Sequence, residues 1–386
     1  MKIALVIHRF GQYITGGSER LCHQTALQLK CSGHDITVLT TCARDYISWK
    51  NHFKPGQDIF DGLAVLRFPV ERERNQKTFN EISTKVFEGR HSRNEEEEWV
   101  RECGPFSPQL IRYIRENRDK YDRFIFFAYR YYNSYFGLRE VPEKSVLVPT
   151  AERDKLINLE IYREFFSLPR GIIYISKEEK ELVNSVTGNH CVKNRISALG
   201  IPVEDNPDPD SFRQRYGMNH PYILYLGRID NNKGSGILYE YFIKYKKVIF
   251  DEIKLVLCGH LFDKVPEHRD IVNIGFIPED QKFNALSACE FLVMPSLYES
   301  LCIVTLEAWA MKKAVLVNEK CNVLKGQVIR SGGGLYFDSY KDFIYCTRYM
   351  LKNRNILKQM GMNGYNYIRQ NYSWKKVMED YQEMLV

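Results

Sequence analysis

The chain has 386 residues, of which 44% are hydrophobic and 13% aromatic. This length and composition are sufficient for two ordinary domain cores. The formal net charge of +7 favours anionic partners, such as nucleotide phosphates, phospholipid surfaces or nucleic acid. The sequence has no zinc-finger spacing, RNP-like motif or concentrated basic arm, so we do not expect nucleic acid to be a partner.

The sequence gives no support to a membrane-spanning protein or to a metal-binding one. The opening MKIALVIHRF is a short apolar run followed at once by polar residues, which is typical of a strand rather than of a signal peptide. No run approaches the ~20 apolar residues that a membrane-spanning helix needs. The ten cysteines form no CxxC pair and the nine histidines no HxH or HxxxH spacing. We therefore expect a cytoplasmic protein without a structural zinc.

The N-terminal half has the rhythm of an α/β domain. Residues 3–7 read as a buried strand, and a helix is expected from Ser18 to about Ser32. Residues 42–107 alternate less cleanly and are interpreted as a loop-rich region followed by a helix. Further buried strands of one parallel sheet are expected at 35–40, 122–128, 145–148 and 171–175.

A domain boundary is predicted in the segment GIPVEDNPDPDS, residues 200–211, because its prolines and acids do not suit a regular element. The N-terminal domain is placed at 1–203 and the C-terminal domain at 204–373. After the boundary the α/β rhythm restarts, and a second parallel sheet is predicted from apolar runs at 222–226, 253–257, 271–274, 291–294 and 314–317. The last predicted helix, 374–386, carries aromatic residues on one side.

The strongest chemical signal is the stretch PSLYESLCIVTLEA, residues 295–308, which follows a buried strand and enters a helix. Glu299 ends the loop and Glu307 lies two turns inside the helix, so both carboxylates can reach one ligand at the carboxyl edge of the sheet. Carboxylates accept hydrogen bonds from sugar and ribose hydroxyls. Helix-start N–H groups suited to a phosphate belong to Leu301, Cys302 and Ile303. Two glutamates at this spacing are common on solvated helices. Only the surrounding motifs make them evidence for a ligand site.

A second motif, YILYLGRIDNNKGSG at 222–236, again takes a strand into a glycine and a polar loop. Arg228 and Lys233 would lie at the carboxyl end of that strand and neutralise a leaving diphosphate, although two cations on a surface turn remain the alternative. In the first strand–helix turn, Gly16 and Gly17 permit close backbone approach to a phosphate.

LYLGRIDNNKG, PSLYES, the ExxxxxxxE pair ending in LEAWA, and GGSER together resemble glycosyltransferase family 4. The resemblance covers nearly the whole C-terminal half and the first strand and loop of the N-terminal half. It implies retaining chemistry and the GT-B fold, in which two Rossmann-like parallel-sheet domains face each other across a cleft. It also implies that the helix at 374–386 returns to the N-terminal, acceptor-side domain, while the other domain binds the nucleotide sugar.

The resemblance also implies roles for individual residues. Arg228 and Lys233 would contact the diphosphate and Glu299 the donor sugar, and these three form the expected catalytic set. Glu307 would contact the ribose. The base would meet the backbone near Ile277, and Gly16 and Gly17 would approach the diphosphate from the other domain.

No cofactor and no metal is implied by the resemblance. The departing phosphate is expected to help deprotonate the acceptor, so a second carboxylate base is not required. Asp208-Pro209-Asp210 resembles a DxD metal motif, but it lies in the proline-rich linker and is interpreted as an ordinary linker segment.

The chain departs from the family pattern at several positions. Tyr129 stands near the place where many relatives have a cleft histidine, and Glu152 follows the next strand, so both are candidates for the acceptor side. For the loop around Glu152, a helix-capping turn is an equal alternative. Lys312 and Cys302 stand where glycines are common.

The leading hypothesis is a retaining, metal-independent hexosyl- or pentosyl-type glycosyltransferase that acts on a glycan or lipid-linked acceptor in surface polysaccharide or glycoconjugate synthesis. Aromatic-basic stretches such as YRYYNSYFGLR, residues 129–139, raise the hypothesis of peripheral association with an anionic membrane, against the plainer interpretation that they pack beneath the sheet. A catalytically inactive nucleotide-binding scaffold is the alternative function. A dinucleotide oxidoreductase is disfavoured because no GxGxxG follows a strand.

Overall fold

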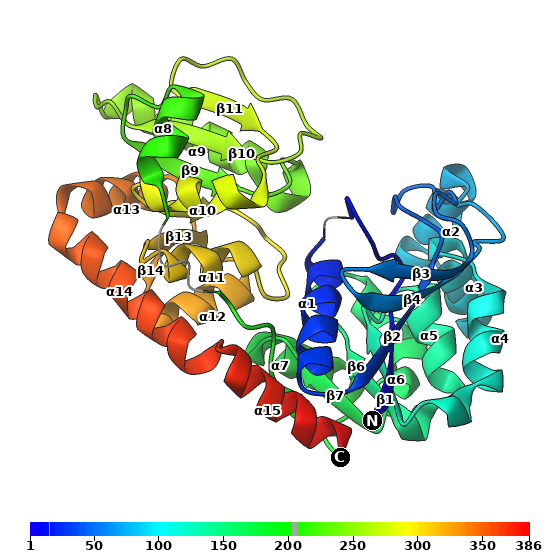
Figure 1. Cartoon of the computed structure of the whole chain (residues 1–386). Helices are drawn as coiled ribbons and strands as arrows, with labels where there is room; N and C mark the ends of the chain where they lie inside the picture. The colour runs from blue at the N-terminus through cyan, green and yellow to red at the C-terminus, as the bar shows by residue number, and fades with distance from the viewer. Residues whose placement is uncertain (15, 203–206) are drawn as a thin grey trace. The chain divides into compact units, whose positions relative to one another are not determined.

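The computed structural model describes residues 1–14, 16–202 and 207–386 (Figure 1). The chain forms two compact units, here called unit 1 (residues 1–199 with 374–386) and unit 2 (residues 200–373). Among the described residues, no helix combines the length and the apolar character needed to cross a bilayer.

Unit 1 is built on an eight-stranded sheet with the order β3-β4-β2-β1-β5-β6-β7-β8. Every neighbouring pair is parallel except β3 and β4, which form an antiparallel edge. The central strands are buried on both faces, which explains their continuous apolar runs. The strands are β1 (Lys2–Val6), β2 (Asp35–Thr41), β3 (Gly56–Phe60), β4 (Leu63–Phe68), β5 (Arg123–Phe127), β6 (Ser145–Val148), β7 (Gly171–Tyr174) and β8 (Lys193–Ile196).

The helices of unit 1 cover this sheet and include the end of the chain (Figure 1). The last helix, α15, contacts β7, β8 and α1, and its Tyr381 and Met384 are buried. The helices are α1 (Gly17–Cys31), α2 (Gln76–Glu88), α3 (Arg93–Cys103), α4 (Pro108–Glu116), α5 (Tyr132–Arg139), α6 (Glu160–Phe165), α7 (Lys177–Thr187) and α15 (Trp374–Leu385).

The expectation for residues 42–107 was incomplete. This region holds the hairpin β3–β4 and the helix α2 in addition to α3. The strand β3 was missed because it is a sheet edge whose side chains are mostly exposed, with Ile59 77% exposed, so it carries no apolar run. The helix α2 buries Val86 and packs the partly buried Phe79, Ile82 and Phe87 against the core of unit 1.

Unit 2 contains a six-stranded parallel sheet with the order β11-β10-β9-β12-β13-β14. The strands are β9 (Tyr222–Leu226), β10 (Lys254–Cys258), β11 (Ile271–Gly275), β12 (Leu292–Met294), β13 (Val315–Asn318) and β14 (Gly334–Phe337). The helices are α8 (Pro209–Tyr216), α9 (Ser235–Val248), α10 (Glu279–Ala288), α11 (Ile303–Ala310), α12 (Asn322–Ser331), α13 (Tyr340–Lys352) and α14 (Arg354–Asn371). The two predicted parallel α/β sheets are confirmed, and β14 adds a sixth strand to the five expected in unit 2.

The helix α11 is anchored by one large side chain. Trp309 is fully buried, and its indole N–H donates to the Gly333 carbonyl at 2.9 Å. A Cβ added to Gly364 of α14 would lie 2.1 Å from the Trp309 ring, so the glycine makes room for the indole. Because α11 carries Glu307, this packing holds one of the predicted site residues in place.

Candidate functional site

The predicted donor residues of unit 2 gather at the carboxyl edge of its sheet. The strand β9 leads into the loop with Arg228 and Lys233, and β12 leads into the loop with Glu299 and then into α11. Since β9 and β12 are parallel neighbours, both loops leave the sheet at the same edge. This is the edge at which open α/β sheets bind ligands.

Lys233 and Glu299 form an ion pair. The Lys233 ammonium lies 2.9 Å from Oε1 of Glu299 and 3.4 Å from the Tyr298 carbonyl. The lysine ends a single 3₁₀ turn (Asn231–Lys233), and its backbone N–H donates to the side chain of Asp230 at 3.0 Å. Two residues that lie 66 positions apart in the sequence are thus joined at this edge of the sheet.

The two loops also touch through their backbones. Gly234 has a φ of +77°, and a Cβ at this position would lie 2.4 Å from the Pro295 carbonyl oxygen. A glycine is therefore needed both for the left-handed conformation and for the close approach. The contact fixes the separation of the Lys233 and Glu299 loops.

Arg228 lies in the same loop but has a different carboxylate partner. Its guanidinium is paired with Asp230 and lies 5.9 Å from the centre of the Phe262 ring. The Tyr225 hydroxyl donates to the Arg228 carbonyl at 2.6 Å, which secures the start of the loop. Asp230 and Phe262 were not singled out in the sequence, where the only signal for Asp230 was its place inside the GRIDNNKG motif.

Glu307 is fully buried in the middle of α11. It lies about one turn inside the helix instead of the two turns expected, because α11 begins only at Ile303. Its partner is Lys282, whose ammonium lies 2.5 Å from Oε1 of Glu307 and also contacts Glu279. Lys282 was not identified from the sequence, because a lone lysine in a helix reads as a solvated side chain. Ile277, the expected neighbour of the base, is 6% exposed just before α10, and the adjacent Phe276 ring stacks on His260 at 4.4 Å.

The start of α11 has an unusual backbone. Cys302 precedes the first helical residue with φ at +61°, and Lys312, just beyond the end of α11, has φ at +55°. Both positions adopt the left-handed conformation that glycine tolerates best, which explains why the family pattern has glycines there. Leu301 is buried, and its carbonyl accepts from the Gln327 amide at 2.7 Å. This hydrogen bond anchors the loop to α12. The backbone N–H groups of Leu301, Cys302 and Ile303 lie at the start of α11.

The Cys302 thiol is expected to be inert. Burial raises its pKa well above the ordinary range for a thiol. In native protein treated with iodoacetamide at about pH 8, we expect the exposed Cys31 and Cys191 to react and the buried cysteines, Cys302 included, to stay unmodified. Peptide mass spectrometry before and after unfolding measures this. Rapid labelling of Cys302 in the native state would contradict the buried position.

In unit 1, the turn between β1 and α1 contains Gly16 and Gly17, and α1 begins at Gly17. A Cβ on Gly16 would lie 2.2 Å from a carboxylate oxygen of Glu19, so glycine leaves room for that side chain. The buried Glu19 accepts from Arg9 Nε at 2.5 Å and lies 3.1 Å from His8 Nε2. A buried charge cluster therefore underlies the paired glycines.

Glu19 makes the stability of this cluster depend on pH. Burial by itself would raise the pKa of Glu19, but the interactions with His8 and then Arg9 outweigh it and lower the pKa from 4.5 to about 2. A pKa that is lower in the folded state gives stability above the unfolded-state value, and this stability is lost as the pH falls toward 2.

We therefore expect the difference in unfolding free energy between wild type and Glu19→Gln to shrink by roughly 3 kcal/mol from about pH 5 to about pH 2. Urea unfolding across this range measures it. The exposed Glu143→Gln variant is the control and should show no such trend. A pH-independent difference for Glu19→Gln would argue against the depressed pKa.

The two acceptor-side candidates have different surroundings. Tyr129 has no exposed surface and packs edge-on against Tyr162 in the core of unit 1, with ring centres 4.7 Å apart. This burial argues against the predicted contact of Tyr129 with an acceptor, since the apolar core leaves its ring no access to solvent. Glu152 is partly exposed, beside a turn whose Ala151 N–H donates to the buried Glu179 at 2.6 Å.

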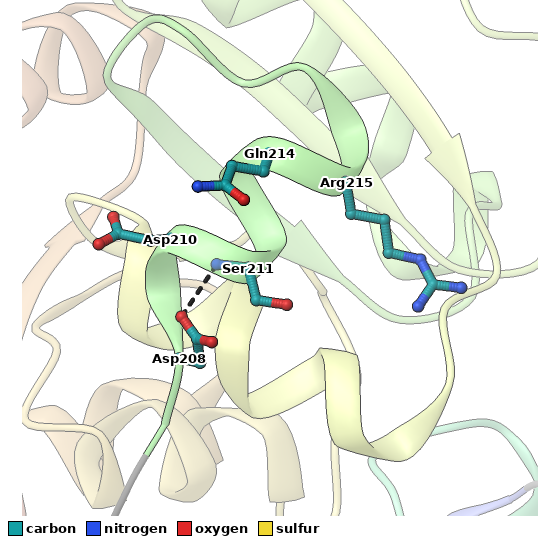
Figure 2. A pocket seen from close by; sticks show the side chains of 5 residues that line it. All are labelled: Asp208, Asp210, Ser211, Gln214 and Arg215. Atoms are coloured by element: carbon teal, nitrogen blue, oxygen red, sulfur yellow. Dashed lines mark hydrogen bonds between the residues drawn. The ribbon is translucent and has the colours of Figure 1, made fainter.

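Asp208 serves as a helix cap. Its carboxylate accepts from the Ser211 N–H at 2.9 Å at the start of α8 (Figure 2). Figure 2 shows that the carboxylates of Asp208 and Asp210 point in different directions beside the pocket that they line with Ser211, Gln214 and Arg215. Among the residues that the structure describes, no group of three or more His, Cys, Asp or Glu is placed to hold a metal ion. The absence of a metal requirement stays a prediction.

Residues 208–367 match the family described as glycosyl transferases group 1, so the family match lies within unit 2. A curated relative, the alpha-maltose-1-phosphate synthase of Mycolicibacterium smegmatis, is 25% identical over 218 residues, which are 49% of this chain and 54% of that protein. The chain thus spans about half the length of this relative.

Solved structures match the whole chain. Sucrose-phosphate synthase from Thermosynechococcus elongatus aligns with a TM-score of 0.71 and 15% identity, covering 99% of this chain and 98% of the other. Anabaena Alr3699/HepE in complex with UDP-glucose aligns with a TM-score of 0.71 and 14% identity, covering 100% and 99%. At these identities the similarity concerns the fold, and the chain has the GT-B fold that the sequence predicted.

Proposed function

We propose that the chain is a retaining glycosyltransferase of family 4 that moves a sugar from a nucleotide diphosphate sugar to a glycan or lipid-linked acceptor in surface polysaccharide or glycoconjugate synthesis. The observation that carries this proposal is the Lys233–Glu299 ion pair at the carboxyl edge of the unit 2 sheet. The match of this unit to group 1 glycosyl transferases supports it.

In the proposed reaction the donor's anomeric carbon–phosphate oxygen bond breaks and negative charge develops on the leaving diphosphate. Lys233 and Arg228 stabilise that charge, together with the N–H groups at the start of α11. Glu299 accepts hydrogen bonds from the donor sugar and Glu307 from the ribose. The acceptor oxygen forms its bond to the anomeric carbon on the face from which the diphosphate leaves, so the anomeric configuration is retained. The leaving phosphate takes the acceptor's proton, and no metal is required.

The test is release of nucleoside diphosphate from a panel of UDP-, GDP- and TDP-sugars, with and without EDTA. UDP-glucose belongs in the panel because HepE was crystallised with it, and sugar phosphates belong among the acceptors because two relatives are synthases of sugar phosphates. Donor-selective release that survives EDTA is the expected result. Nucleotide binding without turnover for any donor and acceptor would favour the alternative, a nucleotide-binding scaffold.

The acceptor and any peripheral association with anionic membrane are further parts of the proposal. Vesicle sedimentation with anionic lipids tests the second part. Binding that weakens as salt rises is expected, because the chain carries a basic excess. Equal recovery of the protein in the supernatant with and without such vesicles would remove the membrane from the proposal.

A further inference from the structure

Lys282 and Glu307 form an ion pair that is almost completely shielded from solvent. Glu307 has no exposed surface, and the side chain of Lys282 is 10% exposed, with its ammonium 2.5 Å from Oε1. The two residues come from different helices, since Lys282 lies in the first turns of α10 and Glu307 in the middle of α11. The pair therefore ties the segment after β11 to the helix after β12.

The Lys282 ammonium compensates the buried charge of Glu307 and fixes the direction of its carboxylate. A charged group that is buried without a partner loses its hydration at a large cost in free energy. A neighbouring ammonium offsets this cost. The two oxygens of a carboxylate accept hydrogen bonds, so one carboxylate can serve two adjacent ribose hydroxyls.

The position of the ammonium is itself constrained. It also contacts Glu279, one helical turn earlier and largely exposed, and it lies 4.6 Å from the centre of the Phe283 ring. These partners place the charge between an exposed and a buried carboxylate. Ile277, the expected neighbour of the base, lies five residues before Lys282 on the same segment.

We propose that Lys282 is a positioning residue for recognition of the donor's ribose, which it achieves by holding the Glu307 carboxylate in place through their buried ion pair. This inference rests on the proposed function, because it assigns Glu307 to the ribose of a nucleotide donor. Lys282 then sets how strongly the protein distinguishes a nucleotide with free ribose hydroxyls from one without them.

The experiment compares the affinity of the full chain for UDP and GDP with its affinity for their 2′,3′-dideoxy analogues by calorimetry. Wild type is expected to prefer the hydroxylated form of the nucleotide that it binds by about 10-fold or more. In Lys282→Met this preference falls to about 2-fold or less, whereas Lys282→Arg keeps most of it because the positive charge remains. With a nucleotide-sugar donor, Lys282→Met raises KM and leaves kcat nearly unchanged.

Lys325→Met is the matched control, since Lys325 forms a 2.5 Å pair with Glu319 in the same unit and is partly exposed. Its ribose preference should equal that of wild type. If Lys282→Met does not fold, Lys282→Gln takes its place, because its polar side chain is shorter and carries no charge; the expected loss of preference is the same.

Two results would count against the inference, and they are distinguishable. If a folded Lys282→Met or Lys282→Gln variant keeps the wild-type preference for the hydroxylated nucleotide, Lys282 does not position Glu307 for the ribose, and the proposed function stands. If wild type binds neither UDP nor GDP nor any nucleotide sugar of the panel, the proposed function fails and the inference fails with it.

Discussion

Replacing Lys233 by alanine is expected to lower kcat for donor turnover by about 100-fold or more while the protein stays folded. Removal of a single preorganised group that stabilises developing charge typically costs a factor of this size. The Lys233 ammonium is held in place by Glu299 and the Tyr298 carbonyl. The measurement is steady-state release of nucleoside diphosphate, with the circular dichroism spectrum as the check on folding.

The exposed Lys358 on α14 supplies the control for this experiment. Lys358→Ala removes the same charge from the chain and should leave kcat and KM unchanged. A Lys233→Ala variant that raises KM alone would mean that Lys233 binds donor and transition state equally. Unchanged kinetics in a folded variant would exclude Lys233 from the donor site.

The second large effect concerns stability. Trp309→Ala is expected to lower the free energy of unfolding by about 3 to 5 kcal/mol, because it removes a fully buried indole and leaves a cavity. It also leaves the Gly333 carbonyl without its indole donor. Denaturant unfolding of wild type and variant measures the difference.

Trp309→Phe is the matched variant, since it keeps much of the ring volume and loses the indole N–H. Its cost should be clearly smaller than that of the alanine variant. Because α11 also carries Glu307, Trp309→Ala is expected to weaken nucleotide binding as well. A loss below about 1 kcal/mol would show that α11 does not depend on this side chain for its packing.

Much of the fold could be predicted because buried parallel strands appear in the sequence as continuous apolar runs. The strands β1, β5, β9 and β12 were expected at nearly their observed positions for this reason. The edge strand β3 was missed because its exposed side chains carry no such pattern. Asp208 was expected in an ordinary linker segment, whereas it caps α8, because its short side chain accepts from a backbone N–H three residues later.

The candidate site was foreseen where its residues share one motif and missed where they meet only in space. Glu299 and Glu307 lie eight positions apart, and Arg228 and Lys233 share one loop, so local spacing was enough to group them. Lys282 was missed because it lies on another helix, 25 positions before Glu307 in the sequence, and the two meet only in the folded chain. Tyr129 was placed near an acceptor by its sequence position, whereas its side chain is buried among other aromatic rings.

The amino-acid sequence by itself determined the succession of strands and helices, the two parallel sheets and the residues that end their strands, because these follow from local periodicity and turn chemistry. Only the tertiary structure decided which charges are paired: Lys233 with Glu299, Lys282 with Glu307, and Arg9 with Glu19. The physical reason is that an ion pair depends on distance and burial, and both arise only when segments remote in the chain pack together.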